Sequence, residues 1–311
     1  MRIFVAGASG AIGRPLVRQL VEAGHEVTGT TRRPERAEEI RAAGAKAVVC
    51  DVYDAEALRT AVAEARPEVV LNELTSLPDR YDPRKPSFYE ETNRVRSEGG
   101  RNLLEAVRAA GARRLVSQSI SFLCAPEGDW VKDEEARPWV DAPGHFGPSV
   151  RVLIDHEREV VDSEDFEGLV LRYGQFYGPR TYFASDGHLG RETRRRRFPI
   201  VGPGTGVFSF IHVEDAAGAT VASLESGSPG VYNVTDDEPA PLHEWLPVYA
   251  EALGAKPPFK VPVWLANLVA GKAVAGNAVA MRGASNEKAK RELGWSPRFA
   301  SWRQGFREAL G

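Results

Sequence analysis

The chain has 311 residues, of which 42% are hydrophobic and 27% are charged, and its formal net charge is −3. The apolar fraction supports a folded core and excludes disorder as the main state, and the near-neutral charge argues against a nucleic-acid binder. Two cysteines, Cys50 and Cys124, exclude a disulfide scaffold and indicate a reducing, cytoplasmic location. The length allows one large α/β domain and a smaller lobe.

The chain shows no targeting segment, because the apolar run in residues 1–10 is too short for a signal peptide. The least polar segment, 261–281, is long enough to span a bilayer, but Asn267, Lys272 and Asn277 interrupt it. We therefore predict a buried or lid-like helix pair there, and neither a membrane nor a nucleic acid among the partners.

Short apolar runs alternate with amphipathic stretches through the first 174 residues. The apolar runs predict strands over 3–7, 26–30, 47–50, 68–72, 113–119 and 168–174. The segments between them predict helices over 14–23, 35–44, 55–65 and 88–110, and another helix follows residue 150. This alternation predicts a Rossmann-type α/β fold, a doubly wound parallel sheet with helices on both faces.

A glycine-rich turn, G-x-x-G-x-x-G, joins the first predicted strand to the first predicted helix. Glycine permits the tight turn, and its missing Cβ lets a pyrophosphate approach the helix N-terminus. In this context the motif predicts a dinucleotide site, and the alternative is a glycine turn without a ligand. The residues expected to contact the cofactor here are Gly7, Ser9, Gly10, Ala11, Ile12 and Gly13.

The end of the second predicted strand indicates which dinucleotide binds. A protein that binds NAD usually has an acidic residue there for the ribose 2′-hydroxyl, but this chain has Arg32 and Arg33. Two guanidinium groups suit a 2′-phosphate, so we expect NADP(H) in preference to NAD(H). The alternative is that both arginines only begin the next helix.

Glycine and proline become frequent after residue 178, and predicted strands become sparse. We therefore predict a dinucleotide-binding domain over 1–178, to which 207–237 returns, and a smaller, mostly C-terminal substrate lobe over 179–206 and 238–311. The run of four arginines at 194–197 is either a solvated helix end or an anion site for a substrate phosphate or carboxylate.

Together these motifs resemble the extended short-chain dehydrogenase/reductase family, also called the NAD-dependent epimerase/dehydratase family. Beyond the glycine turn, the resemblance rests on TNRVRSEGGRNLLEAV (92–107), LRYGQFYGP (171–179), FSFIHVEDAAGA (208–219), GVYNVTDDEP (230–239) and AKRELGWSP (289–297). It implies cofactor contacts from Asp51, Val52, Leu74, Thr75, Asn93 and Tyr173. It also implies substrate contacts from Gln175 and Tyr177, although Tyr177 also suits a structural turn.

The chain departs from this family in its catalytic helix. The family uses a Tyr-x-x-x-Lys pair, in which the tyrosine moves a proton and the lysine lowers the tyrosine pKa from about 10. Counting back from DHEREVV, the tyrosine falls on Ser149 and the lysine on Leu153. The string from Tyr81 to Lys85 contains Pro83, so we do not expect it to be this helical pair.

Four residues are candidates to replace the missing acid. Ser119 and Ser121 end the fifth predicted strand, where they either orient a substrate or only cap the strand. Tyr173 and the loop residue His145 are the other two. The alternative for Tyr173 is a structural or cofactor contact, and the alternative for His145 is a position on the protein surface. We expect His156, Asp155 and Glu157 to lie on a helix surface, and we expect no metal site.

These observations favour an atypical NADP(H)-dependent oxidoreductase that transfers hydride to or from a small substrate with a C=O, C=N or activated C=C bond. A catalytically silent NADP(H)-binding regulator and a sugar-nucleotide epimerase or dehydratase remain open. The helices over 88–110 and after residue 150 allow a homodimer, as in relatives.

Overall fold

The computed structural model describes residues 1–310, and its central element is a seven-stranded sheet in the order β12-β7-β5-β4-β1-β2-β3. Every pairing in this sheet is parallel. The strand order reverses between β1 and β4, which creates the switch point where such sheets bind ligands. The strands are β1 (Arg2–Ala6), β2 (Glu26–Thr31), β3 (Lys46–Val49), β4 (Val69–Asn72), β5 (Arg114–Ile120), β7 (Glu167–Tyr173) and β12 (Gly230–Val234). The predicted Rossmann-type fold is confirmed.

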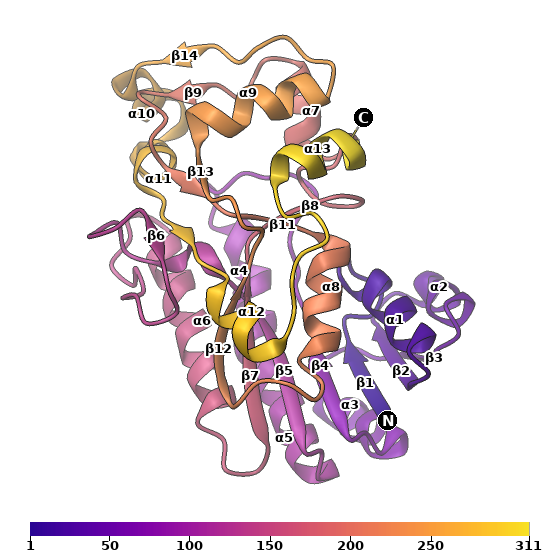
Figure 1. Ribbon diagram of the computed structural model, residues 1–311. Coiled ribbons are helices and arrows are strands. Elements are labelled where there is room, and N and C mark those ends of the chain that lie inside the picture. Colours follow the sequence, from indigo (N-terminus) through magenta and orange to yellow (C-terminus); the bar gives the residue numbers. More distant parts are fainter. Residues whose placement is uncertain (311) are drawn as a thin grey trace.

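Helices cover both faces of the sheet, as the alternation of side chains on β1 shows (Figure 1). Ile3 and Val5 pack into one core, and Phe4 and Ala6 pack into the core on the opposite face. The first core is closed by α1 (Gly13–Glu22), α2 (Ala37–Ala42), α8 (Val213–Ala222) and α12 (Glu287–Leu293). The second is closed by α3 (Ala55–Ala65), α5 (Gly100–Ala110) and α6 (Phe146–Val161).

The helix predicted over 88–110 is not a regular α-helix. It consists of α4 (Ser87–Arg94), a π-helical turn (Val95–Gly99) and α5. A π turn contains one residue more than an α-helical turn. Compared with a regular α-helix of the same sequence, it therefore changes which residues after the turn share a face with the residues before it. This π turn packs beside α6.

The second lobe has its own aromatic core, which includes Trp245, Trp302, Tyr249, Phe210 and Phe306. Its helices are α7 (His188–Arg194), α9 (Leu242–Ala252), α10 (Val263–Ala270), α11 (Lys272–Ala280) and α13 (Trp302–Leu310). Short strands complete the lobe and its junction with the sheet: β6 (Val131–Lys132), β8 (Gln175–Tyr177), β9 (Ile200–Val201), β10 (Val207–Phe208), β11 (Phe210–His212), β13 (Ala240–Pro241), β14 (Lys260–Val261) and β15 (Gly283–Ala284).

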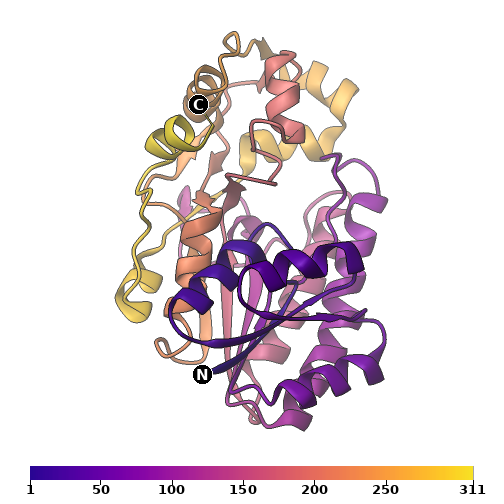
Figure 2. The same cartoon turned by 90° about the vertical axis from the view of Figure 1, so that its right-hand side faces the viewer.

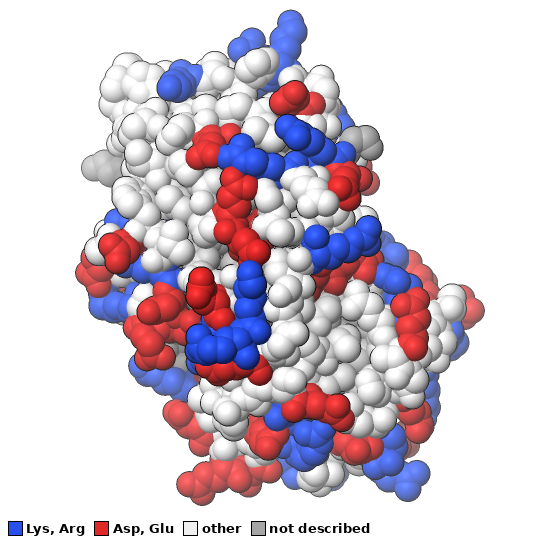
Figure 3. Space-filling model, in the orientation of Figure 1, with Lys and Arg blue, Asp and Glu red and all other residues white. Residues whose placement is uncertain are grey.

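The apolar segment 261–281 forms the predicted helix pair, α10 and α11, but α10 is not buried. Trp264 is 68% exposed and Leu268 is 79% exposed. No helix within residues 1–310 is both long and apolar enough to cross a membrane. Acidic and basic side chains are interspersed over the face seen in Figure 3, without one dominant basic surface there.

The segment after β4 connects the sheet to the second lobe (Figure 2). The Tyr182 hydroxyl donates to the Pro78 carbonyl oxygen at 2.5 Å, and the ring of Tyr81 packs edge-on against Tyr182. The Arg84 guanidinium donates to the Val269 carbonyl oxygen of α10 at 3.3 Å. Residues 81–86 are not helical, so the string from Tyr81 to Lys85 forms no i, i+4 pair, as Pro83 predicts.

Candidate cofactor and active site

The glycine turn between β1 and α1 leaves no room for side chains at two of its glycines. Gly7 has φ +89°, and a Cβ there would lie 2.7 Å from the Glu73 carbonyl oxygen. A Cβ on Gly13 would lie 2.3 Å from the Gly7 carbonyl oxygen. The backbone is therefore packed closely enough to present a bare turn at the N-terminus of α1, which is the surface that a pyrophosphate requires.

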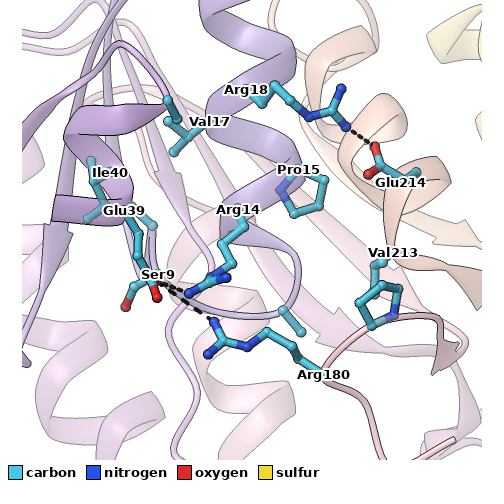
Figure 4. Close-up of a pocket in the computed structure, with 14 residues that line it drawn as sticks. Ser9, Arg14, Pro15, Val17, Arg18, Glu39, Ile40, Arg180, Val213 and Glu214 are labelled. Atoms are coloured by element: carbon cyan, nitrogen blue, oxygen red, sulfur yellow. Dashed lines mark hydrogen bonds and ion pairs between the residues drawn. The ribbon is translucent and has the colours of Figure 1, made fainter. Parts of the chain in front are cut away.

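Ser9 connects this turn to the end of β2, because its hydroxyl lies 2.9 Å from the Thr31 hydroxyl. A cavity of about 330 Å³ opens beside it (Figure 4). Arg14 and Arg180 both reach Glu39 at this cavity, and the Arg180 nitrogen lies 3.9 Å from the carboxylate. Further lining residues are Ala8, Ala11, Pro15, Val17, Arg18, Ile40, Ala43, Pro179, Val213 and Glu214.

Four arginines form a cluster near the end of β2 and are close enough for their positive charges to repel one another: Arg14, Arg33, Arg36 and Arg180. Burial, followed by the neighbouring charges of Arg180 and Arg36, lowers the pKa of Arg14. Burial, followed by the charges of Arg33 and Arg180, lowers the pKa of Arg36. A guanidinium whose pKa is lowered by like charges would be stabilised by an added anion. The turn, the cavity and these arginines thus offer an anion-binding surface of the kind that a dinucleotide needs.

Sequence reasoning found Arg32 and Arg33 but missed Arg14, Arg36 and Arg180. The missed arginines come from α1, from the turn after β2, and from the segment after β8, so no local motif unites them. One signal was present, because Arg180 directly follows the Tyr-Gly-Pro turn. It adopts φ +67°, a left-handed conformation that is uncommon for residues other than glycine.

The remaining predicted cofactor residues lie along the carboxyl edge of the sheet. The Arg32 guanidinium donates to the Ser76 hydroxyl at 3.2 Å, which joins the end of β2 to the segment after β4. In that segment the Leu74 carbonyl oxygen accepts from the Gln118 amide at 3.0 Å, and Thr75 is exposed. Asp51 and Val52 follow β3: Asp51 is exposed, and Val52 is buried.

Helix α6 places the Glu157 carboxylate inside the protein, which corrects the expectation that this residue lies on the helix surface. Glu157 is buried and forms a bidentate ion pair with Arg172 of β7, with distances of 2.9 and 2.5 Å. The Ser119 hydroxyl donates to the same carboxylate at 2.6 Å. Only Asp155 of the three residues in question is exposed. Because Arg172 lies on a distant strand, the helical pattern alone gave no sign of this pair.

His156 is also buried and also contradicts the expectation of a surface position. Its Nε2 lies 2.9 Å from the Ser117 hydroxyl and 3.4 Å from the Asn72 amide nitrogen. Burial, with a smaller effect from the charge of Arg96, lowers the His156 pKa to about 4. The ring is therefore neutral near pH 7 and is a poor proton donor there.

The positions expected for the catalytic tyrosine and lysine hold Ser149 and Leu153, and both are buried. The Ser149 hydroxyl donates to the Asn93 side-chain oxygen at 2.6 Å, so Asn93 is engaged with α6. No tyrosine or lysine occurs anywhere between residues 146 and 161. This helix therefore carries no phenol–ammonium pair for proton transfer.

Comparisons with known proteins identify the family of the chain. The model of the NAD dependent epimerase/dehydratase family matches residues 3–235. The chain belongs to this family. A 3-diazoavenalumate denitrifying reductase from a Streptomyces species is 48% identical over 98% of this chain and 99% of its own length. The protein is therefore an NAD(P)-dependent oxidoreductase of the NAD dependent epimerase/dehydratase family.

Solved structures share the fold of this family member. UDP-glucose 4-epimerase from Thermotoga maritima, solved with UDP-glucose, superimposes with a TM-score of 0.79 at 21% identity and covers 99% of this chain and 97% of its own. A human epimerase family protein solved with NADPH gives a TM-score of 0.75 at 21% identity over 99% of both chains. At these identities the likeness establishes the architecture only.

The other candidates for family roles lie in contrasting surroundings. Tyr173 is fully buried, with its hydroxyl 3.1 Å from the Glu73 carboxylate and 2.6 Å from the Thr220 hydroxyl. Tyr177 is fully buried against α13, where a Cβ on Gly305 would collide with its hydroxyl. Neither side chain exposes surface to a ligand, so the geometry lends no support to their predicted catalytic and substrate roles.

Three candidates remain compatible with a ligand site and stay predictions. Gln175 is half-buried in β8, beside β11. Ser121 directly follows β5 in a short helical turn and is buried. His145 is exposed at the start of α6, with its ring centroid 6.3 Å from that of Tyr89.

Proposed function

We propose that the protein is an NADPH-dependent reductase of a small aryl diazo acid. The arginine cluster beside Ser9 is the observation that supports NADPH as the cofactor. Arg14 and Arg180 share a single carboxylate, Glu39, and Arg36 lies close enough to Arg180 to be affected by its charge, which leaves an excess of positive charge where a 2′-phosphate would bind.

The chain's own residues bind and orient the cofactor in this proposal. The bare turn at Gly7 and Gly13 accepts the pyrophosphate, and the arginines at the end of β2 hold the 2′-phosphate. The bound nicotinamide supplies hydride. Asp51, Val52, Leu74 and Thr75 line the edge along which the adenosine half would lie.

The missing acid favours the substrate class. Carbonyl reduction needs a proton on the developing alkoxide, and α6 has no residue to provide one. An aryl diazonium is already positive, so hydride addition at its terminal nitrogen gives a neutral aryl diazene without a proton donor. The carbon–nitrogen bond then breaks, N₂ leaves, and the diazene hydrogen ends on the ring carbon. The diazo acid named for the Streptomyces relative belongs to this class.

The test combines purified protein, NADPH and an aryl diazo carboxylic acid. We expect one N₂ and one deaminated arene for each NADPH consumed. We expect NADPH to bind roughly tenfold or more tightly than NADH, a difference of about 1.4 kcal/mol. Equal affinity for both cofactors would reject the cofactor assignment. Turnover of ketones but not of the diazo acid would reject the substrate class, and no turnover of any substrate would favour a silent binding protein.

A further inference from the structure

The π-helical turn and α6 pack side by side in parallel, and two contacts fix their register. Asn93 accepts the hydrogen bond from Ser149 at 2.6 Å. Seven residues further along both helices, a Cβ on Gly100 would lie 3.0 Å from the His156 ring. Arg96 lies between these two contacts, so it is opposite the turn of α6 that contains Leu153.

Arg96 has no hydrogen bond or ion pair that holds it among residues 1–310. Its Nε is shielded from solvent and has no acceptor. Glu157 is the carboxylate whose charge reaches Arg96, but that carboxylate already binds Arg172 and Ser119. Burial lowers the Arg96 pKa to about 10, which still leaves the guanidinium charged at neutral pH.

A structural arginine in the same domain looks different. Arg114 is buried at the start of β5 and donates to Glu167 at 2.8 Å, and it also donates to the carbonyl oxygens of Ser223, Ser226 and Gly227. Arg96 is half-buried, and its shielded Nε lacks an acceptor, which is costly for a polar atom away from water. The contrast indicates that the acceptor for Arg96 is supplied by a bound molecule.

We propose that Arg96 supplies, from the neighbouring helix, the positive charge that α6 lacks at Leu153, and that it donates to an acceptor oxygen of the bound ligand. This inference rests on the proposed function for the identity of that ligand. The oxygen belongs either to a hydroxyl of the nicotinamide ribose or to the anionic substrate. In both cases Arg96 holds the reacting end of the complex in place, and it transfers no proton.

The test uses Arg96→Met and Arg96→Lys, with Arg94→Met as the matched control. Arg94 is exposed, pairs with Glu98 and lies over the Tyr53 ring, two residues from Arg96 but on another face. We expect Arg96→Met to lower kcat/KM roughly 100-fold, Arg96→Lys to recover at least a tenth of the wild-type value, and Arg94→Met to change it less than threefold. The melting temperature of Arg96→Met should not fall, because no protein partner is lost.

Binding measurements distinguish the two sources of the oxygen. A weaker NADPH affinity for Arg96→Met, measured by fluorescence without substrate, assigns the acceptor to the cofactor. Unchanged NADPH affinity with a raised KM or a lowered kcat assigns it to the substrate. If both affinity and kcat/KM are unchanged, or if only the melting temperature falls, the proposal is overturned. Wild-type turnover in the same assay tests the proposed function separately, and if a ketone proves to be the substrate, the Arg96 comparison is made with that ketone.

Discussion

The site has two parts: the glycine turn with its surrounding arginines, which we call the cofactor half, and the region around helix α6, which we call the α6 half. The two halves differ in net charge and in how fully their polar groups are hydrogen-bonded. The turn after β1 is bare backbone, and the arginines around it carry more positive charge than Glu39 balances. The α6 half is densely bonded: Ser119, Glu157 and Arg172 satisfy one another in the interior, and His156 is neutral. We therefore assign binding of the cofactor's phosphates to the first half. The second half provides rigidity and has no ionisable pair for moving a proton.

The largest expected effect on cofactor affinity comes from a substitution in the glycine turn. In Gly13→Ala, the new Cβ would lie 2.3 Å from the Gly7 carbonyl oxygen, so the turn must shift. We expect NADPH affinity to fall by roughly 100-fold or more, about 2.7 kcal/mol, in a fluorescence titration. Gly218→Ala is the control, because its Cβ would make ordinary contacts at 3.6 Å or more. Equal affinities for both variants would show that the turn does not contact the cofactor.

The next effect concerns stability and the α6 half. Glu157→Gln removes one partner of the buried ion pair and leaves the Arg172 charge without a counterion. We expect unfolding in urea to become easier by about 3 kcal/mol, since breaking a buried pair from one side is strongly destabilising. Glu159→Gln, an exposed neighbour on the same helix, should change stability by less than about 0.5 kcal/mol. A small effect at Glu157 would contradict the dense packing described for α6.

A third substitution tests whether the arginine cluster makes the protein bind NADPH more tightly than NADH. Arg36→Ala removes one charge from the cluster, so we expect NADPH affinity to fall roughly tenfold while NADH affinity stays the same. Arg41→Ala removes an exposed arginine that pairs with Glu38 outside the cluster, and it should leave both affinities unchanged. Parallel losses for NADPH and NADH would place Arg36 away from the 2′-phosphate.

The smallest effect is a dependence of stability on pH. Burial raises the Glu73 pKa from its ordinary 4.5 to about 8. The folded state thus favours the protonated carboxyl, and this stabilisation is complete below pH 4.5 and is lost as the pH rises through 8. Glu73→Gln keeps a neutral side chain, so its melting temperature should fall less than that of the wild type between pH 6 and 9. Identical pH profiles would show that Glu73 is not buried as a neutral acid.

The fold and the glycine turn were predictable because their signals are local. Strand β1, the turn and α1 follow one another along the chain, and α3 was predicted at its observed bounds of 55–65. The burial of Glu157 was not predictable, because its partner Arg172 is 15 residues away on a different element. The arginine cluster has the same character, since Arg14, Arg36 and Arg180 meet only after the chain folds.

The π-helical turn means that the chain has one residue more between α4 and α5 than a continuous α-helix would need. A π turn contains one residue more than the α-helix requires, so deleting Ser97 would restore a regular repeat without breaking the helix. Because the π turn spreads the extra residue over about one turn, the deletion would leave the helix faces before and after it close to their present orientation. Asn93 would stay beside α6, and the core contacts of Leu103 and Leu104 would remain. Arg96 lies inside the turn itself, so the deletion would change the presentation of Arg96 while the fold stays the same.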